Sequence, residues 1–328
     1  MNRWIDSIAP RFDLDPVTVA PASNDASFRR YFRIRAGDST RIVMDAPPQQ
    51  EDCRSFVHAA QVFGAAGVSV PRVLAADLEQ GFLLLEDFGS ITYLSRLDAQ
   101  SAPALYRDAT AALVVIQKAT APGVFPEYTK ALLNRELMLF PQWYLGRHKG
   151  LELTSEQMQV MQTAFTLVVD SNLAQPAVFV HRDYHSRNLM VLPTGNPGIL
   201  DFQDAVCGPI TYDLVSLLRD AYIRWEEERV LDWAIRYWEA ARAAGLPVNR
   251  DFSAFYRDFE WMGLQRHLKV LGIFARLSHR DGKNDYLKDM PLVLDHVLQV
   301  LRRYVDLAPL ARLVLDIEQQ QPTTGYTF

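Results

Sequence analysis

The 328-residue chain has few cysteines, no long apolar run and no excess of basic residues. Its two cysteines, Cys53 and Cys207, lie far apart without ligand partners at zinc spacing, which excludes a disulfide scaffold. The net charge is −5, so neither nucleic acid nor an anionic membrane is expected as a partner. The apolar runs at 82–85 and 111–116 are too short to span a bilayer. Since the N-terminus also lacks the apolar core of a signal peptide, we expect a cytoplasmic protein.

The first part of the chain, up to about residue 90, carries apolar residues in alternation or in short runs, which is typical of strands. An opening helix is followed by expected strands at 17–20, 28–34, 41–44, 70–74 and 81–86. One helix is predicted from Asp52 to Ala66, because its apolar residues recur at helical spacing and Gly67 can end it.

From Ser101 onward, apolar residues recur every three to four positions, which predicts helices. The expected helices cover 103–118, 132–147, 155–173, 211–225, 227–244, 252–278 and 291–305, with short β segments at 178–180, 189–192 and 198–200. The patterns predict an α+β fold with a small antiparallel β-rich N-terminal lobe, 1–88, and a large mainly helical C-terminal lobe, 89–328. A junction between two such lobes is a favoured place for a small-molecule site.

The segment His181–Asn188 reads HRDYHSRN, and Asp201 follows thirteen residues after Asn188. Phosphoryl transfer needs a carboxylate to orient the acceptor hydroxyl and oxygen ligands to hold Mg²⁺ against the nucleotide phosphates. Asp183 suits the first role, and Asn188 with Asp201 suits the second. The alternative interpretation is a tight turn in which Asp and Asn form local hydrogen bonds. The flanking strands and the spacing of Asp201 favour catalysis.

This segment resembles the catalytic and metal loops of the aminoglycoside phosphotransferase and choline kinase superfamily, which is related to the protein kinases. The resemblance implies a two-lobed protein-kinase-like fold, with a nucleotide-binding N-terminal lobe, and the use of ATP and Mg²⁺. It also implies that His181 organises the loop rather than acting as acid or base. Asp213, within the resembling Asp213-Leu214 pair, would buttress the loop; the alternative is an acid that stabilises a helix N-terminus.

Five further stretches are similar to the bacterial anomeric sugar kinases that phosphorylate N-acetylmuramate and N-acetylglucosamine in peptidoglycan recycling. They are 24–32 (NDASFRRYF), 43–48 (VMDAPP), 81–89 (GFLLLEDFG), 140–145 (FPQWYL) and 181–190 (HRDYHSRNLM). This resemblance implies transfer of the ATP γ-phosphate to the anomeric hydroxyl of such a sugar, giving a sugar 1-phosphate. The alternatives are another small-molecule kinase, acting on an amino alcohol, homoserine or an aminoglycoside, or a non-catalytic nucleotide-binding regulator. We expect a monomer.

The phosphate-binding side departs from an ordinary kinase, which has a glycine-rich loop and a strand lysine. The loop position, 23–28, has no glycine, so Asn24 and Ser27 are candidate phosphate contacts, or simply turn residues. At the lysine position stands Asp45, which could hold Arg29, Arg30 or Arg54, approach a metal, or form a turn before Pro47. Arg29 or Arg30 would then replace the missing lysine, and we take Arg30 as a nucleotide contact.

The stretch 83–89 should connect the lobes, and the resemblance implies that Glu86 and Phe88 lie in the segment that binds adenine through backbone groups. A buried strand ending at a glycine turn is compatible with that role. For the acceptor, Glu136 and Trp143 share a face with Phe140 at helical spacing and could bind a sugar, although such residues are more often core. Asp204 is a further candidate on the substrate side or in support of the metal, with turn capping as the alternative.

Overall fold

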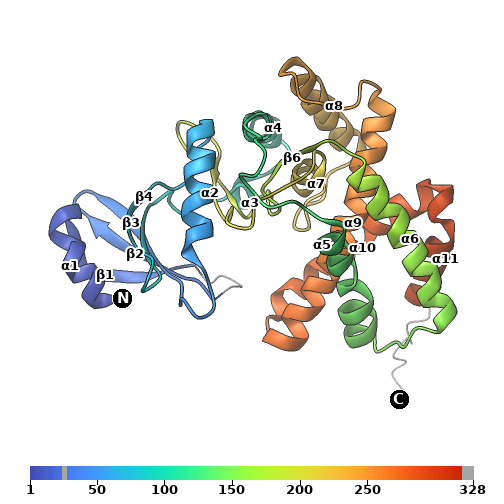
Figure 1. Cartoon of the computed structure of the whole chain (residues 1–328), viewed down its shortest axis with the longest axis horizontal. Helices are drawn as coiled ribbons and strands as arrows, with labels where there is room; N and C mark the ends of the chain where they lie inside the picture. The colour runs from blue at the N-terminus through green and yellow to red at the C-terminus, as the bar shows by residue number, and fades with distance from the viewer. Residues whose placement is uncertain (24–27, 320–328) are drawn as a thin grey trace. The chain divides into compact units, whose positions relative to one another are not determined.

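The computed structural model of the chain describes residues 1–23 and 28–319. It divides into two compact units, and each is considered by itself. The first comprises Met1–Phe125 and His181–Val206, and the second Pro126–Val180 and Cys207–Phe328. The segment with the HRDYHSRN motif therefore groups with the N-terminal sheet, whose strands are blue in Figure 1. The predicted lobe boundary at residue 88 stays a prediction.

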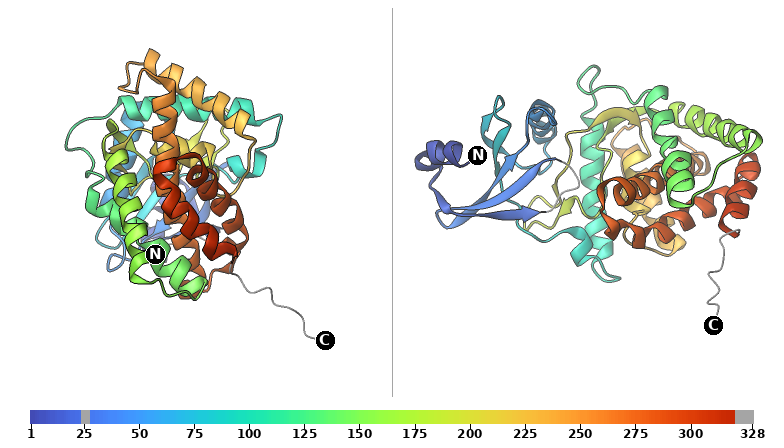
Figure 2. Two further views of the ribbon diagram at one scale, coloured as in Figure 1. Left: turned by 90° about the vertical axis from the view of Figure 1, so that its right-hand side faces the viewer. Right: turned by 90° about the horizontal axis from the view of Figure 1, so that it is seen from below.

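The first unit is built on a five-stranded antiparallel sheet with the order β1-β2-β3-β5-β4. Its strands are β1 (Leu14–Ser23), β2 (Arg30–Ala36), β3 (Ser39–Asp45), β4 (Val73–Asp77) and β5 (Phe82–Glu86). Strands β2 and β3 pair along their whole length as a hairpin, and Figure 2 shows the blue strands of this sheet from two further sides. Gly37 turns the hairpin with a φ of 56°, a left-handed conformation that glycine adopts without strain. The expected β-rich N-terminal part is confirmed.

Helix α1 (Asn2–Phe12) covers part of this sheet with its apolar face. Its Ile5 is buried in one cluster with residues of four strands: Leu14, Ile34, Val43 and Leu84. Helix α2 (Cys53–Ala66) begins where the Asp52 side chain accepts a hydrogen bond from the backbone N–H of Arg54. It ends at Gly67 in a left-handed conformation, so both predicted ends are confirmed. The unit also holds α3 (Tyr93–Arg96), α4 (Ala102–Lys118), β7 (Leu189–Met190) and β8 (Gly198–Ile199).

The second unit is mainly helical, as the apolar spacing predicts (Figure 1). Its helices are α5 (Lys130–Leu137), the π-helix η1 (Phe140–His148), α6 (Ser155–Leu173), α7 (Tyr212–Leu218), α8 (Glu227–Ala243), α9 (Phe252–Asp281), η2 (Asn284–Asp289), α10 (Met290–Arg303), η3 (Val305–Leu307) and α11 (Ala308–Gln319). A two-stranded sheet pairs β6 (Ala177–Val180) with β9 (Val206–Pro209). In the described part of the chain, no helix has the length and apolar character needed to cross a membrane.

Two predicted helices in this unit have the wrong extent, and a third helix was missed. The helix expected at 132–147 is an α-helix, α5, followed by the wider π-helix η1, in which Lys149 N–H bonds to the Tyr144 carbonyl five residues earlier. The helix expected at 211–225 ends at Leu218. Helix α11 was not predicted at all.

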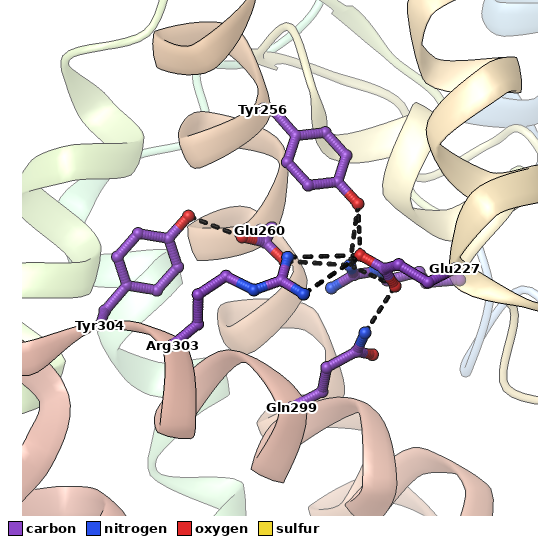
Figure 3. A network of polar contacts seen from close by, with 7 residues as sticks. Glu227, Tyr256, Glu260, Gln299, Arg303 and Tyr304 are labelled. Carbon is purple, nitrogen blue, oxygen red and sulfur yellow. Dashed lines mark hydrogen bonds and ion pairs between the residues drawn. The ribbon is translucent and has the colours of Figure 1, made fainter.

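Four helices of this unit meet at a buried network of charges (Figure 3). The Glu260 carboxylate is 0% exposed and accepts hydrogen bonds from Arg219, at 3.0 Å, and from Arg303. Glu227 contacts the same two arginines. Tyr256, Gln299 and Tyr304 complete the network shown in Figure 3. A buried carboxylate is tolerated when it is paired and hydrogen-bonded in this way.

Two glycines of α9 allow a matched test of packing. A Cβ atom at Gly272 would lie 2.4 Å from the backbone carbon of Leu139, just before η1, whereas one at Gly263 would lie 3.7 Å from Val215. Gly272→Ala should therefore lower the free energy of unfolding by about 2 kcal/mol or more, because backbone must shift. Gly263→Ala should leave it unchanged or raise it by up to about 1 kcal/mol through helix propensity. Chemical denaturation measures both, and equal effects would contradict the close contact.

Candidate active site

The imidazole of His181 fixes the loop that carries the motif. Its Nδ1 accepts the backbone N–H of Asp183 at 3.2 Å, and its Nε2 lies 2.9 Å from the Leu200 carbonyl oxygen, to which it donates. The ring is completely buried, and this burial lowers the pKa of His181 to about 4, although the Asp183 charge opposes the shift. The ring is therefore neutral at neutral pH, which agrees with the expected organising role.

Asn188 connects the other two predicted residues, Asp183 and Asp201. The Asn188 side-chain nitrogen donates to the Asp183 carbonyl at 3.0 Å and to the Asp201 carboxylate at 3.3 Å. The amide oxygen of Asn188 is then the atom with which it would bind a cation. In addition, the Leu200 N–H donates to the Asn188 carbonyl at 2.9 Å, so the loop and the strand before Asp201 are tied together.

Two residues of this site have backbone conformations that side chains disfavour. Asp201 has a φ of 63° and Arg182 a φ of 79°. Such conformations cost on the order of 1 kcal/mol and persist where the surroundings enforce them. Next to Asp201, the buried ring of Phe202 packs on α2 and holds this part of the backbone in place. Its centroid lies 4.8 Å from that of Phe56 and 6.1 Å from that of Phe63. Helix α2 therefore supports the conformation of the predicted metal loop.

Two consecutive arginines reach different carboxylates. Arg30 pairs with Asp45, so the acid at the expected lysine position holds an arginine, as one of our alternatives proposed. Arg29 is 9% exposed and lies 3.5 Å from Glu51 and 3.9 Å from Asp201. Burial would lower the pKa of Arg29, but nearby acidic groups, Asp201 and Glu51 among them, raise it above its ordinary value.

Gln203 connects the acids that follow the strand. Its side-chain nitrogen donates to Asp201 at 2.9 Å and to Asp204 at 3.4 Å. Asp204 itself is exposed, and its carbonyl accepts from Arg182 at 3.4 Å. Asp204 thus lies beside the predicted metal loop, and its role on the substrate side stays a prediction.

The predicted connector is held by an acid that the sequence analysis did not single out. Asp87 accepts hydrogen bonds from Arg33 at 2.6 Å, from Thr40 at 2.7 Å and from the backbone N–H of Gly89 at 2.8 Å. Burial would raise the pKa of Asp87, but these donors lower it below its ordinary value. Its two side-chain partners, Arg33 and Thr40, lie far away in sequence, so no local pattern identifies their pairing with Asp87.

The two predicted connector residues have different surroundings. Glu86 ends β5, and its side chain accepts from Arg72 at 3.0 Å. Phe88 packs against the backbone of Gly198, where an added Cβ atom would lie only 2.6 Å from the ring. Gly198 therefore allows the Phe88 ring to contact β8 directly. The nucleotide-binding roles of Glu86, Phe88 and Arg30 stay predictions, and those of Asn24 and Ser27 fall outside the described residues.

The remaining candidates for acceptor binding and loop support, Glu136, Trp143 and Asp213, lie in the second unit. Glu136 is 5% exposed, its carboxylate is 3.1 Å from the Lys269 ammonium, and it accepts from the Tyr128 hydroxyl. Trp143 is half-buried in η1, and Asp213 is buried in the first turn of α7. Their predicted roles are not tested by these contacts, although the charge of Glu136 is balanced within its own unit.

Sequence reasoning missed Glu51, Gln203 and Asp87. Gln203 could have been found, because it lies between two acids that had already been selected, Asp201 and Asp204. Glu51 follows the proline pair after β3, a position that suggested only a turn. Its contact with Arg29 depends on the path of the chain between them.

The sequence of the chain is similar to a known enzyme family and to known kinases. The model of the phosphotransferase enzyme family matches residues 18–250. An N-acetylmuramate/N-acetylglucosamine kinase of Pseudomonas aeruginosa is 49% identical over 326 residues, covering 97% of this chain and 96% of that protein. These similarities confirm the family resemblance of the sequence motifs.

Solved structures show the same fold at low identity. A choline kinase, LicA, from Streptococcus pneumoniae is 13% identical with a TM-score of 0.63, covering 90% of this chain and 98% of its own. An ADP-bound aminoglycoside phosphotransferase, APH(2'')-Ib, is 14% identical with a TM-score of 0.58, covering 91% and 98%. The expected two-lobed, kinase-like α+β fold class is confirmed.

The depressed pKa of His181 predicts a pH dependence of stability. The folded ring stays neutral down to about pH 4, whereas the unfolded ring takes up a proton below about pH 6.5. Its contribution is therefore complete above pH 6.5 and is lost as the pH falls toward 4. Between pH 7 and pH 5 the wild type should lose about 2 kcal/mol more unfolding free energy than His181→Gln, which keeps a donor and an acceptor but cannot titrate. Urea denaturation at both pH values measures the difference; equal losses would contradict it.

Proposed function

Because the chain belongs to the phosphotransferase enzyme family, we propose that it is an ATP-dependent kinase of N-acetylmuramate or N-acetylglucosamine. Support for the substrate comes from a relative of that name that is 49% identical over nearly the whole chain. The observation that supports the chemistry is that one amide, that of Asn188, donates both to the backbone carbonyl of Asp183 and to the carboxylate of Asp201. A pure nucleotide binder does not need the acceptor-side carboxylate of Asp183.

The phosphate acceptor in this proposal is the anomeric hydroxyl, so the product is the sugar 1-phosphate used in cell-wall recycling. An anomeric hydroxyl is more acidic than an ordinary alcohol, and modest base assistance is enough to activate it. Asp183 would accept a hydrogen bond from that hydroxyl and take its proton as the new bond to phosphorus forms. A monomeric state and a cytoplasmic location remain predictions.

The oxygens gathered at Asn188 and Asp201 fit Mg²⁺. This ion binds hard oxygen ligands, commonly one or two from the protein together with substrate phosphates and water. The carboxylate of Asp201 and the amide oxygen of Asn188 are such ligands. The two side chains are held together by the hydrogen bond from the Asn188 Nδ2 to the Asp201 Oδ2, at 3.3 Å. When bound, the ion would neutralise charge on the phosphates. Gln203, which donates to the other oxygen of Asp201, would fix the direction of that carboxylate.

A panel of acceptors tests the proposed substrate and the position of transfer. With Mg²⁺ and ATP, release of ADP should depend on N-acetylmuramate or N-acetylglucosamine and should fall to background with their 1-O-methyl glycosides, which lack the anomeric hydroxyl. Choline, homoserine and an aminoglycoside serve as competing acceptors. Turnover of a 1-O-methyl glycoside would overturn the anomeric position, and no acceptor-dependent release at all would overturn the kinase itself.

The role of Asp183 has its own test. Asp183→Asn should lower kcat by about 10²- to 10⁴-fold, because the amide cannot accept the hydroxyl proton. Binding of ADP should stay within about threefold of the wild type, since Asp183 is on the acceptor side. Asp170→Asn is the control, because it neutralises an exposed carboxylate paired with Lys130 and should leave both values unchanged. Full turnover by Asp183→Asn would show that the base is another group.

A further inference from the structure

The arginine that replaces the missing strand lysine can be selected from the contacts of the first unit. Ordinary kinases place a lysine against the nucleotide phosphates and hold it with a glutamate. Here Asp45 stands at the lysine position, and Arg30 pairs with it. Because Arg30 compensates the charge of Asp45, this pair is close to neutral and leaves the phosphates without their usual cation.

Arg29 has the surroundings that a phosphate-binding cation needs. Its guanidinium lies between Glu51, at 3.5 Å, and Asp201, at 3.9 Å. It lines a small hollow together with Glu51, Cys53 and Gln203. Asp201 is the carboxylate proposed to bind Mg²⁺, so the guanidinium is adjacent to the place where metal-bound phosphates would lie.

The side chain of Arg29 is also constrained, unlike that of its neighbour. Arg29 is 9% exposed, whereas the side chain of Arg30 is 63% exposed. A buried arginine loses less conformational freedom when it binds a ligand, and its planar fork suits phosphate oxygens. Glu51 precedes α2, the helix that also anchors the metal loop through Phe202. The Arg29–Glu51 ion pair thus joins the residue before β2 to the segment before α2.

We propose that Arg29 is the cation that binds the β- and γ-phosphates of the nucleotide and that Glu51 is its positioning residue. The pair takes the place of the lysine–glutamate pair of ordinary kinases, with the cation supplied from the residue just before β2 rather than from β3. This inference rests on the proposed function, since it assumes that a nucleoside triphosphate binds beside Asp201.

Nucleotide binding, measured by calorimetry with Mg²⁺, tests Arg29. Arg29→Gln should weaken binding of ATP and ADP by at least about tenfold, because a charge-assisted contact to the outer phosphates is lost. Binding of AMP should stay within about twofold. Arg29→Lys should recover part of the loss, since it restores charge without the fork. Arg35→Gln is the matched control, because Arg35 lies on β2, the strand that follows Arg29, and its exposed pair with Asp15 is outside the site.

The comparison of ATP, ADP and AMP binding separates the loss of a phosphate contact from a folding defect. An equal loss for ATP, ADP and AMP in Arg29→Gln would show that the residue is structural and would overturn the inference. So would unchanged binding of all three. A loss that follows the number of phosphates in Arg30→Gln but not in Arg29→Gln would assign the cation to Arg30 and would equally overturn it.

A double-substitution cycle tests Glu51. Glu51→Gln should weaken ATP binding several-fold in the wild type and have no further effect in Arg29→Gln, because Glu51 acts through that guanidinium. Independent, additive effects would overturn the positioning role. The binding measurements need no sugar, so they can succeed when the acceptor panel fails. Conversely, if the wild type phosphorylates its sugar normally but Arg29→Gln binds ATP, ADP and AMP as the wild type does, only this inference is overturned.

Discussion

The site depends on one buried imidazole that joins two segments of chain. His181 holds the backbone of Asp183 on one side and the carbonyl of Leu200, immediately before Asp201, on the other. The proposed base and the proposed metal ligand are consequently positioned by the same ring. Its stacking on Phe63 of α2, with ring centroids 6.4 Å apart, extends this support to the helix that also packs against Phe202.

Charge in the first unit is arranged as pairs rather than as a continuous patch. Arg30 is with Asp45, Arg33 is with Asp87, and Arg29 lies among acids. Each pair fixes a different stretch of backbone: the end of β3, the connector and the approach to the metal loop. Such pairs allow several ionised groups to remain close to one another at limited electrostatic cost.

Local patterns in the sequence predicted the features that local physics determines. Helix α6 begins at Ser155 with a capping box and ends at Leu173, as the apolar spacing indicated. The convergence of Asp183, Asn188 and Asp201 was also predicted, because short strands flank the loop and leave few ways to connect them. Spacing alone could not reveal that the helix after Thr129 becomes a π-helix, since an apolar residue every three to four positions fits either kind of helix.

Contacts between residues distant in sequence were beyond such reasoning. Arg29 and Glu51, like Arg33 and Asp87, are brought together only by the order of the strands. The buried partner of Glu136, Lys269, lies on a different helix with no signal linking the two. The departure from the family pattern suggested Arg29 or Arg30 in place of the missing lysine, but not which of these two adjacent arginines lies near Asp201.

The carboxylate of Glu260 also limits how the enzyme can be redesigned. Its charge is balanced by Arg219, at the end of α7, and by Arg303, at the end of α10. A chimera that exchanges α10 alone with a distant relative would leave that carboxylate without one of its two cations. An exchange that keeps this network intact would therefore have to move α7, α8, α9 and α10 together.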